Sequence, residues 1–226
     1  MSHRQTLKVA SAQYPIDQPA TLELWRDKIA HWVAEGAATG AEVLVFPEYA
    51  AIEQAAALGE TVYSDLDATL KAVAELEPDR VALHLELAAK HGVHILVGSG
   101  PSRKGASYVN AAQLVTPKGS VGVQEKLIMT PFETDWGISA GTEARVFDTA
   151  LGLVGINICY DSEFPLLARA MAEAGTELLL VPSCTERISG YHRVRTGSRA
   201  RALENQIAAV VSPDRRRRAL VARGGP

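Results

Sequence analysis

The sequence has few cysteines, few aromatic residues and no long apolar run, and each shortage excludes a class of protein. Two cysteines, Cys159 and Cys184, in 226 residues exclude a disulfide scaffold, although one bridge between them stays open. Aromatic residues make up 6% of the chain and no basic patch alternates with them, which argues against nucleic-acid binding. No apolar run approaches the roughly 18 residues of a membrane span, and the first residues contain no apolar signal-peptide core. We therefore expect a cytoplasmic protein with reduced thiols and no membrane partner.

Metal and cofactor motifs are also missing. The six histidines form no ligand set, and the chain contains no CxxC pair and no glycine-rich phosphate loop. The sequence therefore predicts neither a metal nor an organic cofactor. His192, in the stretch SGYHRVRTGS, is expected at the rim of a pocket.

The composition is that of one soluble globular domain with an unusual end. Hydrophobic residues make up 47% and charged residues 22%, and 226 residues can bury a large core. The net charge is −3, yet residues 213–226 contain five arginines and one aspartate, so the body is more acidic than this total. We expect one domain over residues 1–213 and a basic tail over residues 214–226.

Short apolar strands alternate with amphipathic helices along the chain, which predicts an α/β fold. Hairpins within the pattern indicate mixed rather than purely parallel sheets. The expected strands are residues 7–14, 42–48, 93–100, a hairpin over 107–126, a strand pair within 144–158, 177–183 and 207–212. The expected helices are residues 21–40, 66–91 with a break near Pro78, 165–175 and 198–206.

Three reactive side chains each follow an expected strand. Glu48 follows VLVFP, Lys126 follows SVGVQE and Cys159 follows VGINI. Functional sites of α/β folds gather beyond strand ends, so we expect these three side chains to meet, with the thiol at a rim rather than in a core.

Their chemistry is complementary. A free thiol is mostly protonated at neutral pH, so a nucleophilic Cys159 needs a base, a cation or a helix N-terminus nearby. Glu48 can accept the thiol proton, Lys126 can stabilise the thiolate and a developing oxyanion, and the helix expected from Pro165 can add its positive end. Glu48 can then protonate a departing amine and activate water against the thioester. This is a complete acyl-transfer cycle without histidine or metal.

Five stretches carry a resemblance to a known family. They are FPEYA (46–50), EKLIMTPFE (125–133), ICYDSEFP (158–165), VPSCT (181–185) and RALENQ (201–206). In this order and spacing the chain resembles the nitrilase superfamily of carbon–nitrogen hydrolases, from residue 7 to about residue 213. Each motif alone is weak, but the ordered set is specific.

The resemblance implies a four-layer α-β-β-α sandwich with two mixed sheets, and a homodimer or larger homo-oligomer. It maps the family's glutamate base onto Glu48, its lysine onto Lys126 and its nucleophile onto Cys159, and Glu133 matches a second glutamate found in many members. Tyr160 and Asp161 after the cysteine are similar to the amide-hydrolysing branches, whereas nitrile-cleaving members more typically carry Trp-Glu. The expected partner is therefore a small-molecule substrate, a small linear amide, and we expect Tyr160, Cys184 and His192 to lie near it.

Other interpretations of the same residues stay open. Cys159 also fits a small buried apolar residue, and an N-cap or an ion pair would explain Glu133 equally well. Cys184 fits a structural role or a place in the pocket lining. A nitrilase, an N-carbamoyl amide hydrolase or a non-catalytic member of the same fold are the alternative functions.

The end of the chain departs from the family pattern. After AAVVSP the family typically continues through further strands, whereas this sequence continues as DRRRRALVARGGP. Four consecutive arginines cannot form a buried strand without a large desolvation cost. We therefore expect a fold that lacks the last strands, and a tail over residues 214–226 that is disordered or arises from a frameshift.

Overall fold

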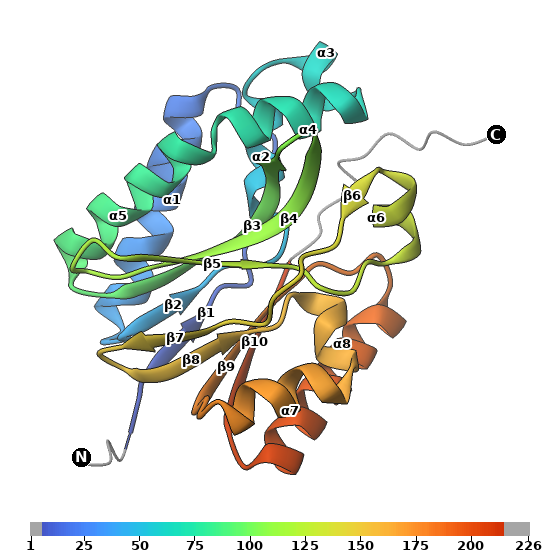
Figure 1. Ribbon diagram of the computed structural model, residues 1–226. Helices are drawn as coiled ribbons and strands as arrows, with labels where there is room; N and C mark the ends of the chain where they lie inside the picture. The colour runs from blue at the N-terminus through green and yellow to red at the C-terminus, as the bar shows by residue number, and fades with distance from the viewer. Residues whose placement is uncertain (1–5, 215–226) are drawn as a thin grey trace.

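The structure is a computed structural model, and it describes residues 6–214. Two sheets lie face to face, with helices on the outer face of each (Figure 1). The strands of the first sheet have the order β1-β2-β3-β4-β5, with β6 paired to β4, and those of the second have the order β10-β9-β8-β7.

The first sheet begins parallel and ends antiparallel. β1, β2 and β3 pair in parallel, whereas β3 with β4 and β4 with β5 pair antiparallel. Because two antiparallel steps restore the direction, β2 and β5 run the same way and end toward the same edge of the sheet. The strands are β1 (Val9–Ser11), β2 (Val43–Val45), β3 (His94–Lys104), β4 (Ser107–Val115), β5 (Val121–Glu125) and β6 (Ile138–Ser139).

The second sheet is parallel apart from one edge hairpin. β8, β9 and β10 pair in parallel, and β7 pairs antiparallel with β8. β9 lies between two parallel neighbours, and all of its residues are buried. The strands are β7 (Val146–Thr149), β8 (Gly152–Ile156), β9 (Leu178–Ser183) and β10 (Ala208–Pro213).

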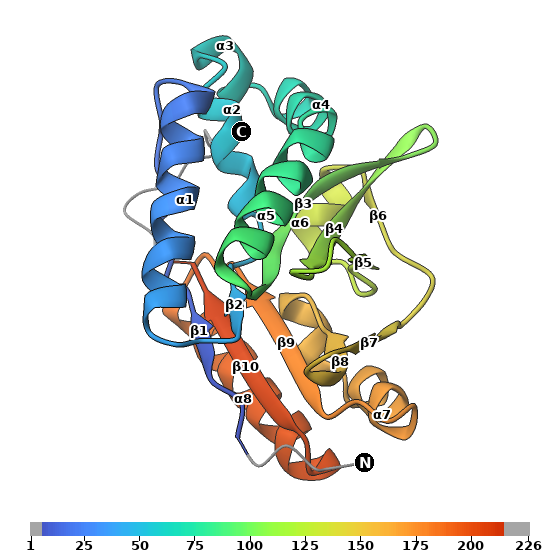
Figure 2. The same ribbon diagram turned by 90° about the vertical axis from the view of Figure 1, so that its left-hand side faces the viewer.

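The helices form the two outer layers, as the turned view in Figure 2 shows. The first sheet is covered by α1 (Leu22–Ala38), α4 (Leu66–Glu75) and α5 (Glu77–His91), and the second by α7 (Pro165–Glu173) and α8 (Ile188–Asn205). Shorter helical segments lie in the connections. They are η1 (Ala50–Ile52), α2 (Glu53–Ala56), α3 (Glu60–Tyr63), α6 (Pro131–Asp135) and η2 (Cys159–Glu163).

Alternation along the strands divides the core into two layers of apolar side chains. On β2, Val43 and Val45 face the second sheet, whereas Leu44 faces α1 and α5. On β3, Leu96 joins the layer between the sheets and Ile95 joins the layer under the helices. The two-residue repeat of a strand therefore supplies both apolar layers of the four-layer sandwich.

Two serine hydroxyls join the sheets where β10 meets the first sheet. The Ser212 hydroxyl donates to the carbonyls of Ala12 and Val45 at 2.9 and 2.8 Å, and the Ser11 hydroxyl donates to the Val211 carbonyl at 2.8 Å. These bonds fix the lateral position of one sheet on the other.

The expected four-layer sandwich with two mixed sheets is confirmed, and most expected elements are present. The strand expected at residues 7–14 is confined to Val9–Ser11, and the helix expected at 198–206 begins ten residues earlier, at Ile188. The residues that follow Cys159 form the short η2 segment, so α7 begins only at Pro165. No helix within residues 6–214 is long and apolar enough to cross a membrane. The tail expected at 214–226 lies outside the described residues except for Asp214, whose N–H donates to the Ser183 carbonyl at 3.0 Å.

Candidate active site

Glu48 lies three residues beyond β2, where the chain crosses the middle of β3. Gly98 of β3 has a φ of +87°, and a Cβ there would meet the Pro47 carbonyl oxygen at 2.3 Å, so only glycine lets the two segments approach this closely. Tyr49, which follows Glu48, has a φ of 57°, in the left-handed region. This turn places the Glu48 carboxylate in the interior, with a side chain 2% exposed.

Lys126 comes directly after β5, and its ammonium lies between two carboxylates. Its Nζ donates to Oε1 of Glu48 at 2.8 Å and to Oε2 of Glu133 at 2.6 Å. Its backbone is held on both sides, because its N–H donates to the Asn110 carbonyl at 2.8 Å and its carbonyl accepts from Gly141 at 2.7 Å. The lysine is therefore a fixed, buried cation.

Glu133 lies behind Lys126, on α6, and its carboxylate accepts five hydrogen bonds. The backbone N–H and the hydroxyl of Thr130 donate to Oε2 at 3.0 and 2.6 Å, which ties the first turn of α6. The Tyr49 hydroxyl and the Asn110 amide donate to Oε1 at 2.7 and 3.1 Å. Glu133 thus both caps a helix and forms an ion pair.

Cys159 is the first residue of η2, at a tight bend three residues beyond β8. Its φ of 48° lies in the left-handed region, which costs a non-glycine residue on the order of 1–3 kcal/mol and is typical of functional sites. The Ser162 hydroxyl donates to its carbonyl at 2.7 Å. Its Sγ lies 3.3 Å from the Ser183 hydroxyl oxygen and 3.7 Å from the Cys184 carbonyl oxygen. The thiol is buried, with the residue 5% exposed, so the expectation of a thiol at a rim is wrong.

Asp161 joins the segment after Lys126 to the bend at Cys159. Its carboxylate accepts backbone N–H groups from Leu127 at 3.1 Å, Ile128 at 2.8 Å and Ile158 at 3.0 Å. Burial raises its pKa to about 7, and the three N–H donors oppose that rise. One carboxylate therefore holds the segment after Lys126 against the bend at Cys159, and so helps to fix the separation of these two reactive residues.

A cavity of about 170 Å³ brings together most of the residues expected from the sequence. Glu48, Lys126, Cys159, Tyr160 and Cys184 line it, with further lining residues from α6 and the start of α8. Glu133 lies just behind this wall and is fully buried. His192 does not line this cavity; it is exposed on α8, with its ring against that of Tyr191 at 5.4 Å. The expected place of His192 at the pocket rim is therefore not observed.

Burial and charge shift the titration of the cavity groups in a consistent way. Burial raises the pKa of Glu48, and the adjacent Lys126 ammonium opposes this rise. Burial lowers the pKa of Lys126, but the two carboxylates outweigh it and raise the pKa above its ordinary value. For Glu133, burial raises the pKa, but Lys126 and the other donors outweigh it and lower the pKa below its usual range. Lys126 is therefore charged, and Glu48 is the weaker acid of the two carboxyls.

The thiol is held in its neutral form. Burial and the neighbouring Glu48 charge raise the pKa of Cys159 well above its ordinary value, while Lys126 opposes the shift. A thiol in this setting needs a base that takes its proton at the moment of attack, because a free thiolate is disfavoured in the resting site.

Three site residues were not identified from the sequence. The Asn110 amide donates to Oε1 of Glu48 at 3.0 Å and also to Glu133. The Tyr49 hydroxyl contacts Glu133, and the Ser183 hydroxyl contacts Cys159. Tyr49 and Ser183 lie inside stretches that carry the family resemblance, so their positions were a usable signal. Asn110 lies within a buried strand and has no such signal.

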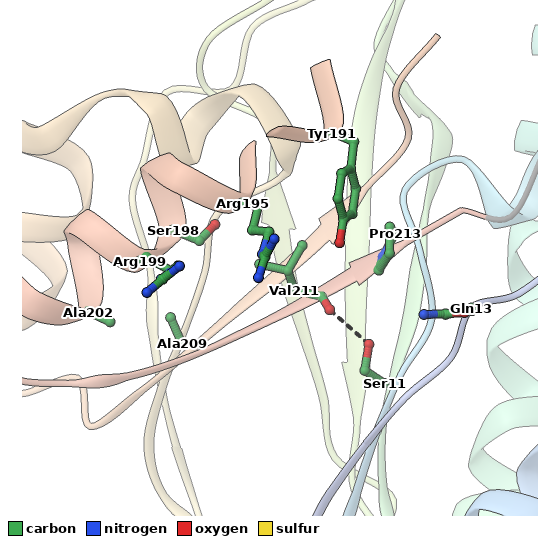
Figure 3. Close-up of a pocket in the computed structure, with 10 residues that line it drawn as sticks. All are labelled: Ser11, Gln13, Tyr191, Arg195, Ser198, Arg199, Ala202, Ala209, Val211 and Pro213. Carbon is green, nitrogen blue, oxygen red and sulfur yellow. Dashed lines mark hydrogen bonds between the residues drawn. The ribbon is translucent and has the colours of Figure 1, made fainter. Parts of the chain in front are cut away.

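A second cavity of about 360 Å³ lies between α8 and β10 (Figure 3). Arg195 and Arg199 of α8 extend over β10, and the bond from the Ser11 hydroxyl to the Val211 carbonyl crosses its floor. None of the reactive residues expected from the sequence lines it. Within residues 6–214, no group of three or more histidine, cysteine or acidic side chains is arranged to hold a metal ion.

Comparison with known proteins identifies the family. Residues 8–217 match the carbon-nitrogen hydrolase family. This chain belongs to that family. The matched residues include all five stretches that carry the resemblance, and with them Glu48, Lys126, Glu133 and Cys159.

Curated relatives are identical to this chain at about a third of the aligned residues. The chain is 36% identical over 207 residues to the probable hydrolase YhcX of Bacillus subtilis (strain 168), and this alignment covers 91% of this chain and 40% of that protein. It is 31% identical over 140 residues to the omega-amidase NIT2-B of Xenopus laevis, which covers 58% of this chain and 51% of that protein. The chain thus spans about half or less of the length of these relatives.

Solved structures share the fold. Nit3 of Saccharomyces cerevisiae, a member of branch 10 of the nitrilase superfamily, superposes with a TM-score of 0.73 at 23% identity, over 92% of this chain and 75% of that chain. A mutant of the amidase from Nesterenkonia sp. AN1, with acrylamide added to its active-site cysteine, superposes with a TM-score of 0.69 at 22% identity, over 92% of this chain and 79% of that chain.

Proposed function

We propose that this carbon-nitrogen hydrolase cleaves the C–N bond of a small linear amide through a thioester on Cys159. The observation that carries the proposal is the cavity itself, where a buried thiol, a carboxylate of raised pKa and a fixed ammonium meet from three strand ends. Each group can contribute to the steps of amide hydrolysis.

The cycle begins with proton transfer from sulfur to carboxylate. Glu48 takes the Cys159 proton while the sulfur attacks the amide carbon, and a C–S bond forms as the carbonyl π bond becomes an oxyanion. Lys126 supplies a buried positive charge close to that oxyanion, where low polarity strengthens the interaction. Because its ammonium is already held at 2.8 Å from Glu48, it needs little reorganisation.

The same carboxyl completes both halves of the reaction. As the tetrahedral intermediate collapses, the C–N bond breaks and protonated Glu48 gives its proton to the departing ammonia or amine. Water then attacks the thioester carbon, Glu48 accepts a water proton, and the C–S bond breaks as that proton returns to sulfur. The raised pKa of Glu48 suits a group that must give and take a proton in turn.

An amide is favoured over a nitrile. Tyr160 and Asp161 follow the cysteine, as in the amide-hydrolysing branches, and the relatives include an omega-amidase. Relatives named nitrilases are also similar, among them nitrilase 3 of Arabidopsis thaliana at 29% identity over 194 residues. A cavity of about 170 Å³ limits either substrate to a small acyl group.

Release of ammonia from a panel of small amides and nitriles tests the proposal. We expect release from amides by the wild-type chain, none by Cys159→Ala, and retained release by Cys184→Ala, which changes the other cysteine of the same cavity. Equal release by wild type and Cys159→Ala would refute the cysteine mechanism. Release from nitriles alone would replace the amide by a nitrile, and no release from folded wild type would favour a non-catalytic member.

Assembly and location stay predictions. We expect a homodimer or a larger homo-oligomer in the cytoplasm, and sedimentation of the purified chain measures the first of these. A monomer at all concentrations would refute it.

A further inference from the structure

One contact to the sulfur has no part in the cycle described above. The Ser183 hydroxyl lies 3.3 Å from Sγ of Cys159, and Ser183 is 2% exposed. Sulfur is the only hydrogen-bond partner of this hydroxyl in the part of the chain that the structure describes. A buried hydroxyl directed at a single sulfur atom is placed to donate to it.

The backbone of Ser183 is rigid, which makes the contact persistent. Ser183 is the last residue of β9, the strand with parallel neighbours on both sides, and it is paired in register with Pro213 of β10. Its carbonyl accepts from the N–H of Asp214 at 3.0 Å. Preorganised groups of this kind need no rearrangement when charge develops.

We propose that Ser183 is a further catalytic residue, whose hydroxyl donates a hydrogen bond to the Cys159 thiolate as it forms and as it leaves the thioester. The proposal rests on the proposed function of Cys159 as the nucleophile. In the neutral site the Cys184 carbonyl oxygen, 3.7 Å from Sγ, can accept the thiol hydrogen, and a sulfur lone pair can then accept from the Ser183 hydroxyl. When the proton moves to Glu48, the carbonyl becomes a poor neighbour for the negative sulfur, whereas the hydroxyl becomes a better one.

Two of the three N–H donors of Lys126 go to carboxylates, and within residues 6–214 no hydrogen bond joins its ammonium to Sγ of Cys159. It acts on the sulfur through charge, while Ser183 acts through a directed O–H. The hydroxyl therefore lowers the raised pKa of Cys159 and assists each departure of sulfur as a leaving group.

The test is the pH dependence of Cys159 alkylation by iodoacetamide, measured in a Cys184→Ser background so that one thiol reacts. Ser183→Ala removes the hydroxyl and little volume. We expect the alkylation midpoint to rise by about one to two pH units, since a hydrogen bond to a charged group is worth about that much. We also expect kcat for amide hydrolysis to fall about tenfold or more, with KM changed less.

Two further variants make the result specific. Ser183→Thr keeps the hydroxyl and is expected to restore the midpoint. Ser212→Ala changes another fully buried serine, whose hydroxyl bonds two carbonyls between the sheets, and is expected to leave the midpoint unchanged.

The outcomes separate this proposal from the proposed function. If circular dichroism shows that Ser183→Ala is folded and its alkylation midpoint equals that of wild type, the proposed role of Ser183 is overturned, whatever the effect of the substitution on stability. Equal shifts in Ser183→Ala and Ser212→Ala overturn it too, because the effect is then not local. A wild type that hydrolyses no amide, but whose alkylation midpoint still rises in Ser183→Ala, refutes the proposed function alone, since the thiol titration still reports on Ser183.

Discussion

Replacing Glu133 by glutamine tests whether the two buried carboxylates compete for one ammonium. Glu133 and Glu48 contact Lys126 at 2.6 and 2.8 Å, so the ammonium is shared almost equally. Glutamine keeps the shape of the side chain and one oxygen acceptor, but it removes the charge. Lys126 then has one ionic partner, Glu48.

The size of the effect follows from these distances. At an effective dielectric constant of about 20, two charges at 2.6 Å attract each other by about 6 kcal/mol, and loss of one partner of a buried pair costs about 3–5 kcal/mol. Because Lys126 keeps Glu48, we expect the free energy of unfolding to fall by about 3 kcal/mol in Glu133→Gln. Urea unfolding at pH 7 measures it.

The effect on Glu48 has a definite sign. The Glu133 charge raises the pKa of Glu48 and the Lys126 charge lowers it. Glu133→Gln removes the first influence and strengthens the second, so the pKa of Glu48 falls. The acid limb of kcat/KM against pH should move to lower pH, while the plateau falls about a hundredfold because Glu48 becomes a weaker base.

A matched control separates charge coupling from loss of structure. Glu53 is also a fully buried carboxylate, hydrogen-bonded to Lys28 and Tyr14 away from the cavity. Glu53→Gln should lower stability but leave the acid limb in place. An acid limb that stays fixed, or moves to higher pH, in folded Glu133→Gln would refute the coupling and leave Glu133 as a helix cap alone.

Three other perturbations probe the surroundings of the site. Gly98→Ala should lower the free energy of unfolding by about 2–4 kcal/mol and reduce activity, because its Cβ would meet the Pro47 carbonyl at 2.3 Å; unchanged thermal unfolding would contradict this. Asp161→Asn should cost about 1–3 kcal/mol and slow Cys159 alkylation, because three N–H donors lose a carboxylate; a variant that equals wild type in both would contradict it. Burial lowers the pKa of His84 to about 4 from 6.5, so the unfolded chain binds its proton first as pH falls. Stability contributed by the neutral His84 is present above pH 6.5 and lost toward pH 4, about 2 kcal/mol of it between pH 7 and 5, and His84→Gln should flatten that dependence in urea unfolding.

The local spacing of apolar residues predicts the helices and strands around the site well where a single helical or strand repeat dominates a segment. The strands before Cys159 and Cys184 are apolar runs ended by a break, and α1 has a regular apolar face with Trp25, Ile29 and Val33 buried. Such segments bury the same side chains whatever their partners, so a local rule suffices.

The start of α8 was not predictable by the same rule. Residues 188–197 are polar and contain Gly190 and Gly197, which a sequence pattern reads as breaks. In the structure a Cβ at Gly197 would meet the Ser162 carbonyl at 2.9 Å, and one at Gly190 would meet Thr185 at 3.0 Å. These glycines let the helix pack closely on its neighbours, and a close approach is a tertiary property.

The site shows the same division. Strand-end position identified Glu48, Lys126 and Cys159, because the direction of strands brings their ends together. Asn110 lies 62 residues from Glu48 and 23 from Glu133, yet its amide contacts both carboxylates. Nothing local distinguishes it from an asparagine in any buried strand, since its role depends on where two other chain segments pass.

Charge balance in the cavity supports the proposed transfer of the Cys159 proton to Glu48. With a neutral thiol, two carboxylates and one ammonium give the buried cluster a net charge of −1. Loss of the thiol proton to solvent would make it −2, which burial and the Glu48 charge oppose by raising the pKa of the thiol. Transfer of that proton to Glu48 keeps the charge at −1 and removes the carboxylate that repels the thiolate. In the proposed cycle, the features that raise the pKa of the resting thiol therefore also favour Glu48 as its base, and Lys126 and the Ser183 hydroxyl are left to stabilise the sulfur once the proton has moved.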